Sequence, residues 1–305
     1  MKPISSTVLN FKNISELMYY LQQPSPSHPL IALVNYDDMA VKPFSSQQKI
    51  AIDFYKISFK TSFTGQVKYG QGHYDFQGGG LAFLKPQQIV ISSDDAGGYE
   101  GYSLYFHPDF IRNYPLAKII NQYGFFSYSV SEALFLSDKE QKVIDGLFES
   151  IASELNNNID QYTQDVLVSQ IDLLLNYSNR FYNRQFIIRK VINNEMIAQL
   201  DNLLEDYFNK ETALAQGLPS VQYLSEQLNV SPRYLSDMLR STAGQNTQHY
   251  IHEKLIAKAK DQLSTTDLSV SEIAYRLGFE HPQSFSKLFK TKTEQSPLKF
   301  RKSFD

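Results

Sequence analysis

The sequence predicts an α+β protein with a β-rich N-terminal part and a separate all-α C-terminal unit. Short runs rich in Ile, Val, Phe and Tyr, separated by Gly and Pro, occupy the first third of the chain, which is typical of strands joined by turns. Beyond Asp109, apolar residues recur at helical spacing instead. After residue 219, one helical pattern occurs twice in succession, which indicates a second folded unit.

Length and composition fit two folded units and exclude some kinds of site. The chain has 305 residues, 42% hydrophobic and 13% aromatic, which is enough for more than one core. Because it has no cysteine, disulfides, cysteine-ligated zinc and a thiol nucleophile are excluded. The N-terminal residues lack the apolar core of a secretory signal, and no apolar run is long enough to span a bilayer. We expect a cytoplasmic protein with no membrane partner.

Charge is divided unevenly along the chain. The net charge of −3 by itself gives no sign of nucleic-acid binding. Residues 1–180 hold 13 basic and 18 acidic residues, whereas residues 217–305 hold 12 basic and 9 acidic ones. A surface that binds a polyanion is therefore expected in the C-terminal unit.

The first third predicts a compact β structure. Strands are expected at 49–59, 65–72 and 79–93. Brief strands with turns about every ten residues predict an antiparallel sandwich or a small barrel. The many Tyr and Phe residues between 54 and 106 are able to line an apolar ligand pocket, but a well-packed barrel needs the same residues, so we assign most of them to the core.

Helices follow the predicted strands. Two are expected at 138–155 and 163–182, and they pair either with each other or with a second chain. Their expected inward residues are Val143, Leu147, Ile151 and Leu155 in the first helix, and Val166, Ile171, Leu174 and Leu175 in the second. A third helix is expected at 194–208, followed by a linker at 209–219 that contains Gly217 and Pro219. The predicted domains are 1–182, a helix and linker at 183–219, and a C-terminal domain at 220–305.

The C-terminal unit contains an internal repeat, since residues 221–239 align with residues 270–289 after one extra residue in the second turn. The matched pairs are Leu224 and Ile273, Ser225 and Ala274, Leu228 and Leu277, Val230 and Phe279, Pro232 and Pro282, Leu235 and Phe285, and Leu239 and Phe289. Each copy predicts two helices and a tight turn, with Asn229 or Gly278 where the turn needs a left-handed backbone. This is a helix-turn-helix pattern. An ordinary helical bundle has similar apolar spacing, but two copies are a more specific signal.

A helix expected at 246–265 joins the two copies. Its inward residues are predicted to be Tyr250, Leu255, Ala259 and Leu263. About eighteen residues at 1.5 Å each give a rod of roughly 27 Å. Such a rod is able to hold two recognition helices near one turn of B-DNA apart, about 34 Å, so that both enter successive major grooves.

Residues 217–302 resemble the DNA-binding domain of the AraC/XylS family of bacterial transcription regulators. The resemblance rests on the second copy and the segment after it: Ile273, Ala274, Gly278, Phe279, Phe285, Phe289 and Lys290, then Ser296, Pro297, Phe300 and Arg301. Two positions depart from the family pattern. Glu294 stands where the family commonly has the glycine that ends the recognition helix, and Leu255 stands where the connecting helix commonly has an arginine.

The resemblance implies a function and a domain plan. It implies a sequence-specific, double-stranded-DNA-binding transcription regulator, commonly an activator that works with RNA polymerase. The strands near residues 74–88 and 102–111 are similar in layout to the cupin-like β-barrel sensor domain of such regulators. In the family, that barrel holds a small-molecule effector, and trailing helices make a homodimer. No cofactor is implied.

Helix geometry selects the residues expected to meet DNA. In the second copy Phe285, Leu288 and Phe289 take the buried stripe. The expected base contacts are Arg233, Ser236, Asp237, Gln283, Ser284 and Lys287. The expected phosphate contacts are Arg240, Lys290, Lys292, Lys299 and Arg301. Asp237 either accepts a hydrogen bond from a cytosine amino group or pairs with Arg233 or Arg240 on the same helix face.

Other functions remain open at this point. A cupin-type enzyme tethered to DNA needs clustered metal ligands, but between residues 49 and 111 this chain offers only the isolated His73 and His107, and we expect neither a metal site nor catalysis. His249 and His252 are expected on a solvated helix face. An architectural DNA-binding protein is the third alternative, and it would bind with little sequence preference.

Overall fold

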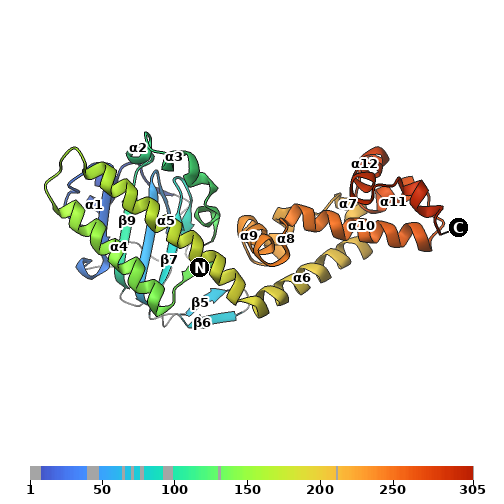
Figure 1. The fold of residues 1–305 in the computed structure, drawn as a ribbon, viewed down its shortest axis with the longest axis horizontal. Coiled ribbons are helices and arrows are strands. Elements are labelled where there is room, and N and C mark those ends of the chain that lie inside the picture. The colour runs from blue at the N-terminus through green and yellow to red at the C-terminus, as the bar shows by residue number, and fades with distance from the viewer. Residues whose placement is uncertain are drawn as a thin grey trace. The chain divides into compact units, whose positions relative to one another are not determined.

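The computed structural model describes residues 8–39, 48–63, 66–69, 72–75, 79–91, 99–129, 132–210 and 212–304. The chain divides into two compact units, residues 1–185 and residues 186–305 (Figure 1). Among the described residues, no helix combines the length and the apolar character needed to cross a membrane.

The strands of the first unit form a sheet region. Five of them make one sheet in the order β10-β7-β4-β9-β2, three make a second in the order β1-β3-β8, and β5 pairs with β6. The strands are β1 (Leu9–Phe11), β2 (Ile31–Asn35), β3 (Lys49–Ile52), β4 (Tyr55–Phe63), β5 (Gln66–Tyr69), β6 (Gly72–Asp75), β7 (Gly80–Leu84), β8 (Val90–Ile91), β9 (Tyr99–Phe106) and β10 (Leu134–Phe135). The predicted strand at 49–59 is thus two strands, which belong to different sheets.

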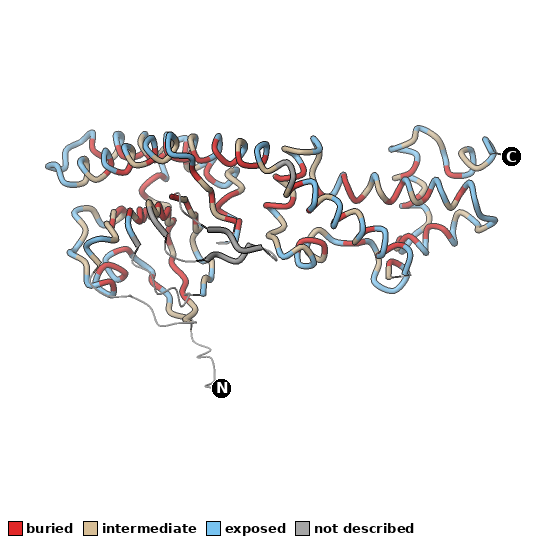
Figure 2. The backbone as a smooth tube through the Cα atoms, turned by 90° about the horizontal axis from the view of Figure 1, so that it is seen from below, coloured by how far each residue is buried: buried red, intermediate tan, exposed pale blue. Residues whose placement is uncertain are grey.

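The helices of this unit are mostly short. They are α1 (Ile14–Tyr20), η1 (Tyr36–Asp38), α2 (Pro108–Ile111), α3 (Leu116–Ile119), η2 (Ile120–Gln122), η3 (Gly124–Ser127), α4 (Asp138–Asn156) and α5 (Thr163–Ile188). The long helices α4 and α5 turn their buried residues toward the five-stranded sheet (Figure 2). The Phe148 ring of α4 stacks on Phe59 of β4 and on Tyr102 of β9, at centroid distances of 5.4 and 5.6 Å. Aromatic packing of this kind fixes the helix pair on the sheet.

The opposite face of the five-stranded sheet packs against α1, β1 and β3. Their shared apolar cluster includes Phe11, Ile14, Ile50, Phe54 and Tyr105. The described strand pairs fall into separate sheets, and β1 pairs with β3 in parallel, whereas every other strand pair is antiparallel. A closed cupin barrel is therefore not confirmed. What is established is a mixed fold with an N-terminal sheet region and a C-terminal helical domain.

The buried face of α4 differs from the predicted one. Ile151 is fully buried as predicted, but Ile144 and Phe148 are fully buried as well, whereas Val143 is 38% exposed. In α5, Ile171, Leu174 and Leu175 are buried as predicted, but Val166 is 39% exposed. The prediction was based on aliphatic residues at helical spacing. In the structure the buried face of α4 is rotated toward Ile144 and Phe148, because Phe148 buries more apolar area against the sheet.

In the described residues of the second unit, the regular elements are all helices. Its helices are α6 (Lys190–Asn209), α7 (Thr212–Gln216), α8 (Val221–Gln227), α9 (Pro232–Ala243), α10 (Thr247–Thr265), α11 (Val270–Arg276), α12 (Pro282–Thr293) and α13 (Pro297–Arg301). The connecting helix α10 contacts α9 of the first copy and α11 of the second (Figure 1). Its buried residues include Tyr250, Leu255, Ala259 and Leu263, which confirms the predicted inward face.

Candidate nucleic-acid interface

Each copy of the repeat is a helix, a tight turn and a second helix. The first copy is α8 and α9, and the second is α11 and α12. In the first turn the Val230 N–H donates to the Ser225 carbonyl at 3.0 Å, and in the second the Phe279 N–H donates to the Ala274 carbonyl at the same distance. These hydrogen bonds join residues that the sequence alignment pairs, so the two copies share one backbone geometry.

The turns require an unusual backbone. Asn229 has φ +55° and Gly278 has φ +91°, as predicted for these two positions. Asn and Gly adopt this left-handed region more readily than other residues. The small residues Ser225 and Ala274 are fully buried where the two helices of each copy meet. The sharp turn and the close crossing together hold α9 and α12 in place.

Local capping residues set where these helices begin. The Ser231 hydroxyl accepts a hydrogen bond from the Tyr234 N–H at 3.2 Å, and Pro232 occupies the first turn of α9. Ser269 and Glu272 form a reciprocal capping box at the start of α11. Hydrogen bonds from Ser269 hold the pKa of Glu272 below its ordinary value. Glu272 is therefore an anion at neutral pH and suits the helix N-terminus.

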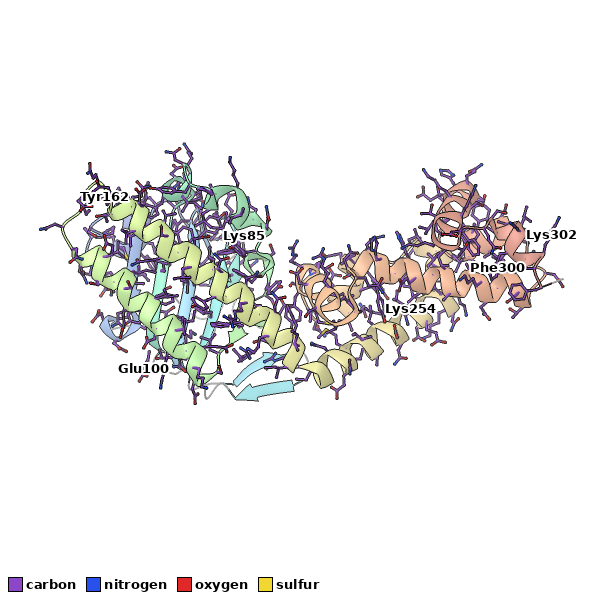
Figure 3. The ribbon with its side chains drawn as sticks, in the orientation of Figure 1. Lys85, Glu100, Tyr162, Lys254, Phe300 and Lys302 are labelled. Atoms are coloured by element: carbon purple, nitrogen blue, oxygen red, sulfur yellow. The ribbon has the colours of Figure 1, made fainter. Side chains whose placement is uncertain are left out.

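The outward face of α12 is polar and basic. Phe285 and Phe289 are fully buried, and the Phe289 ring meets Phe300 of α13 edge-on at 5.5 Å. On the opposite face lie exposed side chains of one character: Gln283, Ser284, Lys287 and Lys290. Lys292 and Lys299 are exposed as well, and Lys302 lies beyond α13 near the C-terminus (Figure 3). Six of the predicted contact residues thus lie at the surface on or next to one helix.

The outward face of α9 is organised differently. Asp237 accepts from Arg233 Nε at 2.9 Å and from Arg240 Nη1 at 2.6 Å. The Asp237 side chain is only 18% exposed, while the two arginine side chains are 42% and 49% exposed. One of the two interactions that the sequence left open for Asp237, the intrahelical pair with arginine, is present in the structure. Within the helix, the carboxylate offsets part of the positive charge that both arginines present.

Two predicted contact residues are engaged inside the domain. Ser236 Oγ accepts from the Thr247 N–H at 3.3 Å and lies 3.2 Å from Thr247 Oγ1, at the start of α10. Arg301 donates through Nε to the Leu263 carbonyl at 3.2 Å and through Nη2 to the Leu268 carbonyl at 2.6 Å. These carbonyls belong to the end of α10 and the segment before α11. Ser236 and Arg301 therefore help to hold helices together within the domain, and their contact with DNA stays a prediction.

The connecting helix has the expected length. Its 19 residues correspond to about 28 Å at 1.5 Å per residue. Leu255, which stands where the family commonly has an arginine, is completely buried, so this position serves packing. His252 forms a hydrogen bond with Gln248. Its pKa is lowered, mainly by burial and to a smaller extent by the positive charge of Lys292. His252 therefore adds no positive charge to this surface at neutral pH.

One further residue belongs to this surface although the sequence analysis did not select it. His281 precedes Pro282 at the N-terminus of α12, is exposed, and makes no side-chain capping bond. The N-terminal residues of a recognition helix are those that contact base edges. The signal in the sequence was its place just before the proline that begins the helix.

Metal ligation has little support in the described part of the chain. No group of three or more His, Asp or Glu side chains there is placed to hold a metal ion. His107 Nδ1 accepts from the Asp109 N–H at 3.2 Å and caps α2, which is a local structural role. The side chain of His73 lies outside the described residues.

Comparison with known proteins agrees with this geometry. Residues 224–303 match the family model described as a helix-turn-helix domain. The chain is 27% identical over 147 residues to an uncharacterised HTH-type transcriptional regulator of Staphylococcus aureus, a match that covers 48% of this chain but 18% of the relative. It is 31% identical over 143 residues to the HTH-type transcriptional activator RhaS of Salmonella paratyphi B, covering 47% of this chain and 46% of RhaS. The chain thus spans less than half the length of these relatives.

Solved structures also show similarity to part of this chain. The C-terminal domain of the response regulator yesN from Fusobacterium nucleatum is 33% identical, with a TM-score of 0.29, covering 33% of this chain and 95% of that one. The DNA-binding domain of AdpA, solved in complex with a target DNA, is 24% identical with a TM-score of 0.31, covering 37% and 91%.

Replacing Glu294 by glycine should stabilise the second unit. Glu294 ends α12 at φ +61°, whereas the corresponding end of α9 is Gly244 at φ +71°. A left-handed conformation costs a non-glycine residue about 1–2 kcal/mol, and a carboxylate at a helix C-terminus is unfavourable as well. Glu294→Gly should therefore raise the melting temperature of this unit in thermal unfolding followed by circular dichroism. Gly244→Ala should lower it, and a lower melting temperature for Glu294→Gly would contradict the explanation.

Removing the charge of Asp237 should strengthen binding to any duplex. In Asp237→Asn, Arg233 and Arg240 keep their positions but lose the adjacent carboxylate. Each newly effective cation should steepen the dependence of log K on log salt by about 0.9. The measurement is fluorescence anisotropy with a random-sequence duplex at several salt concentrations. The control is Asp261→Asn on α10, which changes net charge equally, and an equal slope change in both variants would refute a local effect.

Proposed function

We propose that the protein is a sequence-specific DNA-binding transcription regulator, because its C-terminal domain is a helix-turn-helix domain of the AraC/XylS type. The observation that carries the proposal is the pair of matching helix-turn-helix copies, each of which presents exposed polar and basic side chains on its second helix. Buried phenylalanine and leucine residues fix the opposite faces. Such faces suit the major groove of double-stranded DNA.

In the proposed complex, α9 and α12 enter successive major grooves on one side of the duplex. The connecting helix, about 28 Å long, is close to the roughly 34 Å that separates successive turns of the groove. A rigid rod of this length favours simultaneous contact by both helices. Simultaneous contact links two short base sequences into one longer recognition site, which increases specificity.

The two recognition helices are proposed to divide the work unequally. On α12, Gln283 and Lys287 lie on one face, where Gln suits an adenine edge and Lys suits guanine O6 and N7. Ser284 and His281 extend this reading face. Lys290, Lys292 and Lys299 are proposed to contact phosphates and so to supply affinity that falls with salt. On α9, Arg233 is the proposed base contact and Arg240 the proposed phosphate contact, both restrained by Asp237.

A homodimer is part of the proposal, formed through the outer face of α4 and α5. These helices lie side by side and are joined by residues 157–162, so they run antiparallel (Figure 1). Gln170 donates to Ser150 Oγ at 2.8 Å, which places Leu147 near Leu173 one turn away. Leu173 of α5 is 46% exposed. Val143, which lies one turn before Leu147 on α4, is 38% exposed. A partly exposed apolar strip on a helix pair suits a twofold contact with a second copy.

The first unit is proposed to modulate DNA binding through a small-molecule effector, in the manner of a cupin-like sensor. Ser58 and Ser103 support a ligand site there, since they are cross-strand neighbours on β4 and β9 and are both buried. Buried hydroxyls within an apolar layer are costly unless they find hydrogen-bond partners. Activation, with RNA polymerase as partner, is proposed because RhaS, which is similar over its shared part, is named an activator.

Two alternatives are distinguished by simple measurements. A DNA-tethered cupin enzyme requires a bound transition metal, and elemental analysis of the purified protein tests for one. An architectural protein binds most duplexes with similar affinity, so competition between a selected duplex and random duplex separates it from a specific regulator.

Selection from a random-sequence duplex pool should yield a defined binding sequence, and alanine variants should then separate two classes of contact. Lys287→Ala and Gln283→Ala should each reduce discrimination at one base pair by about 1–3 kcal/mol. Lys290→Ala should instead weaken binding to all sequences and reduce the salt slope by about 0.9. The measurement is anisotropy on a panel of single-base variants. Unchanged discrimination in Lys287→Ala and Gln283→Ala would reject α12 as a reading helix.

Placing a charge on the α4–α5 strip should break the dimer. Leu173→Asp should shift the protein from dimer to monomer in sedimentation equilibrium, because a carboxylate buried without a partner in an apolar contact is costly. The control is Ile159→Asp, since Ile159 is 54% exposed but lies in the connection between the helices. A monomeric unaltered protein, or a dimer that survives Leu173→Asp, would rule out this interface.

A further inference from the structure

We propose that residues 212–219, which precede both helix-turn-helix copies, are a brace that positions the second copy and so fixes the spacing of the two recognition helices. The brace is defined as α7 together with Gly217, Leu218 and Pro219. It lies outside residues 224–303, the part that matches the helix-turn-helix family model. The inference rests on the proposed function, since it assigns a new role in the binding of DNA.

The central contact joins Gly217 of the brace to Gly278 in the turn between α11 and α12. A Cβ atom added to Gly278 would lie 2.6 Å from the Gly217 carbonyl carbon and 2.9 Å from the Leu218 nitrogen. Two main chains therefore touch here with no space for a side chain. Both residues also have positive φ, +80° at Gly217 and +91° at Gly278. The close approach itself requires glycine at Gly278, whereas at Gly217 an added Cβ would lie an ordinary 3.7 Å from the Gly278 carbonyl oxygen, so there glycine serves the positive φ.

The brace is itself held firmly by its neighbours. Tyr207 of α6 donates through its hydroxyl to the Gly217 carbonyl at 3.1 Å, and the Gly217 N–H donates to the Ala213 carbonyl at 2.9 Å. Ala213 and Pro219 are buried on either side of this point. Burial and hydrogen bonding on both sides of Gly217 leave its carbonyl a fixed point against which the second turn rests.

The helix before the brace is tied to the connecting helix. Asp201 of α6 accepts from the Tyr250 hydroxyl at 2.7 Å and from Lys254 Nζ at 2.8 Å, and both donors lie on α10. Figure 3 labels Lys254 on α10. Burial and the bond to Asp201 raise the pKa of Tyr250, so its hydroxyl keeps its proton at neutral pH. Thus α6 is hydrogen-bonded to α10, and the brace that follows α6 contacts the turn between α11 and α12.

Together these contacts link the second copy to the connecting helix α10 by two routes. Along the chain, α10 connects α9 to α11; through space, α6 and the brace connect α10 to the turn before α12. At the end of α10 the second copy is held by Arg301 of α13, and the brace adds a separate attachment at the turn before α12, which further limits pivoting of the second copy. The position of α12 relative to α9 is therefore set by the brace as well as by the length of α10.

The test uses the full chain and a duplex that the unaltered protein selects from a random-sequence pool. Derivatives of this duplex carry one base pair inserted or deleted between the two short sequences that α9 and α12 contact. This changes the separation of these two sequences by about 3.4 Å. The unaltered protein should lose about tenfold or more in affinity for the altered spacings, equivalent to about 1.4 kcal/mol. Tyr207→Phe, which removes one hydrogen bond to Gly217, and Gly278→Ala should reduce this penalty to a few-fold.

The matched control is Gly244→Ala. Gly244 also has positive φ, at +71°, but an added Cβ meets nothing within 4 Å, so this variant introduces backbone strain without touching the brace. It should keep the full spacing penalty, whatever its overall affinity. Circular dichroism should show that Tyr207→Phe remains folded. Retention of the full penalty in Tyr207→Phe and Gly278→Ala would overturn the brace, whereas failure of the unaltered protein to select any duplex would overturn the proposed function itself.

Discussion

The constraint on which the C-terminal domain depends is the close crossing of two helices after a left-handed turn. At each crossing a small residue, Ser225 or Ala274, is completely buried, and at each turn Asn229 or Gly278 takes positive φ. A larger side chain at the crossing would separate the helices, and the second helix would then lose its fixed orientation. The exposure of one face of α12 follows from this geometry, because Phe285 and Phe289 are committed to the opposite side.

The two copies share a backbone but not an electrostatic character. In α9 one carboxylate, Asp237, interacts with two arginines, so the helix presents little net charge. In α12 the residues from Pro282 to Thr293 include three lysines and no acid. In the proposed complex, affinity from phosphate contacts would come mainly from the second copy, and the contacts of the first copy would depend less on charge. Such a division favours discrimination over indiscriminate binding.

The N-terminal unit depends on aromatic packing more than on strand pairing alone. Phe148 stacks on rings from β4 and β9, and Tyr182 of α5 stacks on Phe125 at 5.4 Å. These contacts decide which face of each helix is buried. They leave Val143 and Leu173 on the outer side of the helix pair, where the proposed twofold contact lies. Of the aromatic residues between 54 and 106 that the sequence offered for a ligand pocket, Phe54, Phe59, Phe83 and Tyr105 are buried in the core.

The sequence alone determined the helix-turn-helix copies, because their signals are local: helical spacing of apolar residues, a proline at the start of α9 and α12, and a residue suited to positive φ in each turn. It also identified Gln283, Ser284 and Lys287 as exposed, because Phe285 and Phe289 occupy the buried face of α12 and these three residues lie on its opposite face. Only the tertiary structure decided the order of strands in the sheets, the buried face of α4, the inward engagement of Ser236 and Arg301, and the contact between Gly217 and Gly278. Each of these depends on residues brought together from distant parts of the chain, and the local pattern of a sequence does not encode which distant partner will lie within hydrogen-bonding or packing distance.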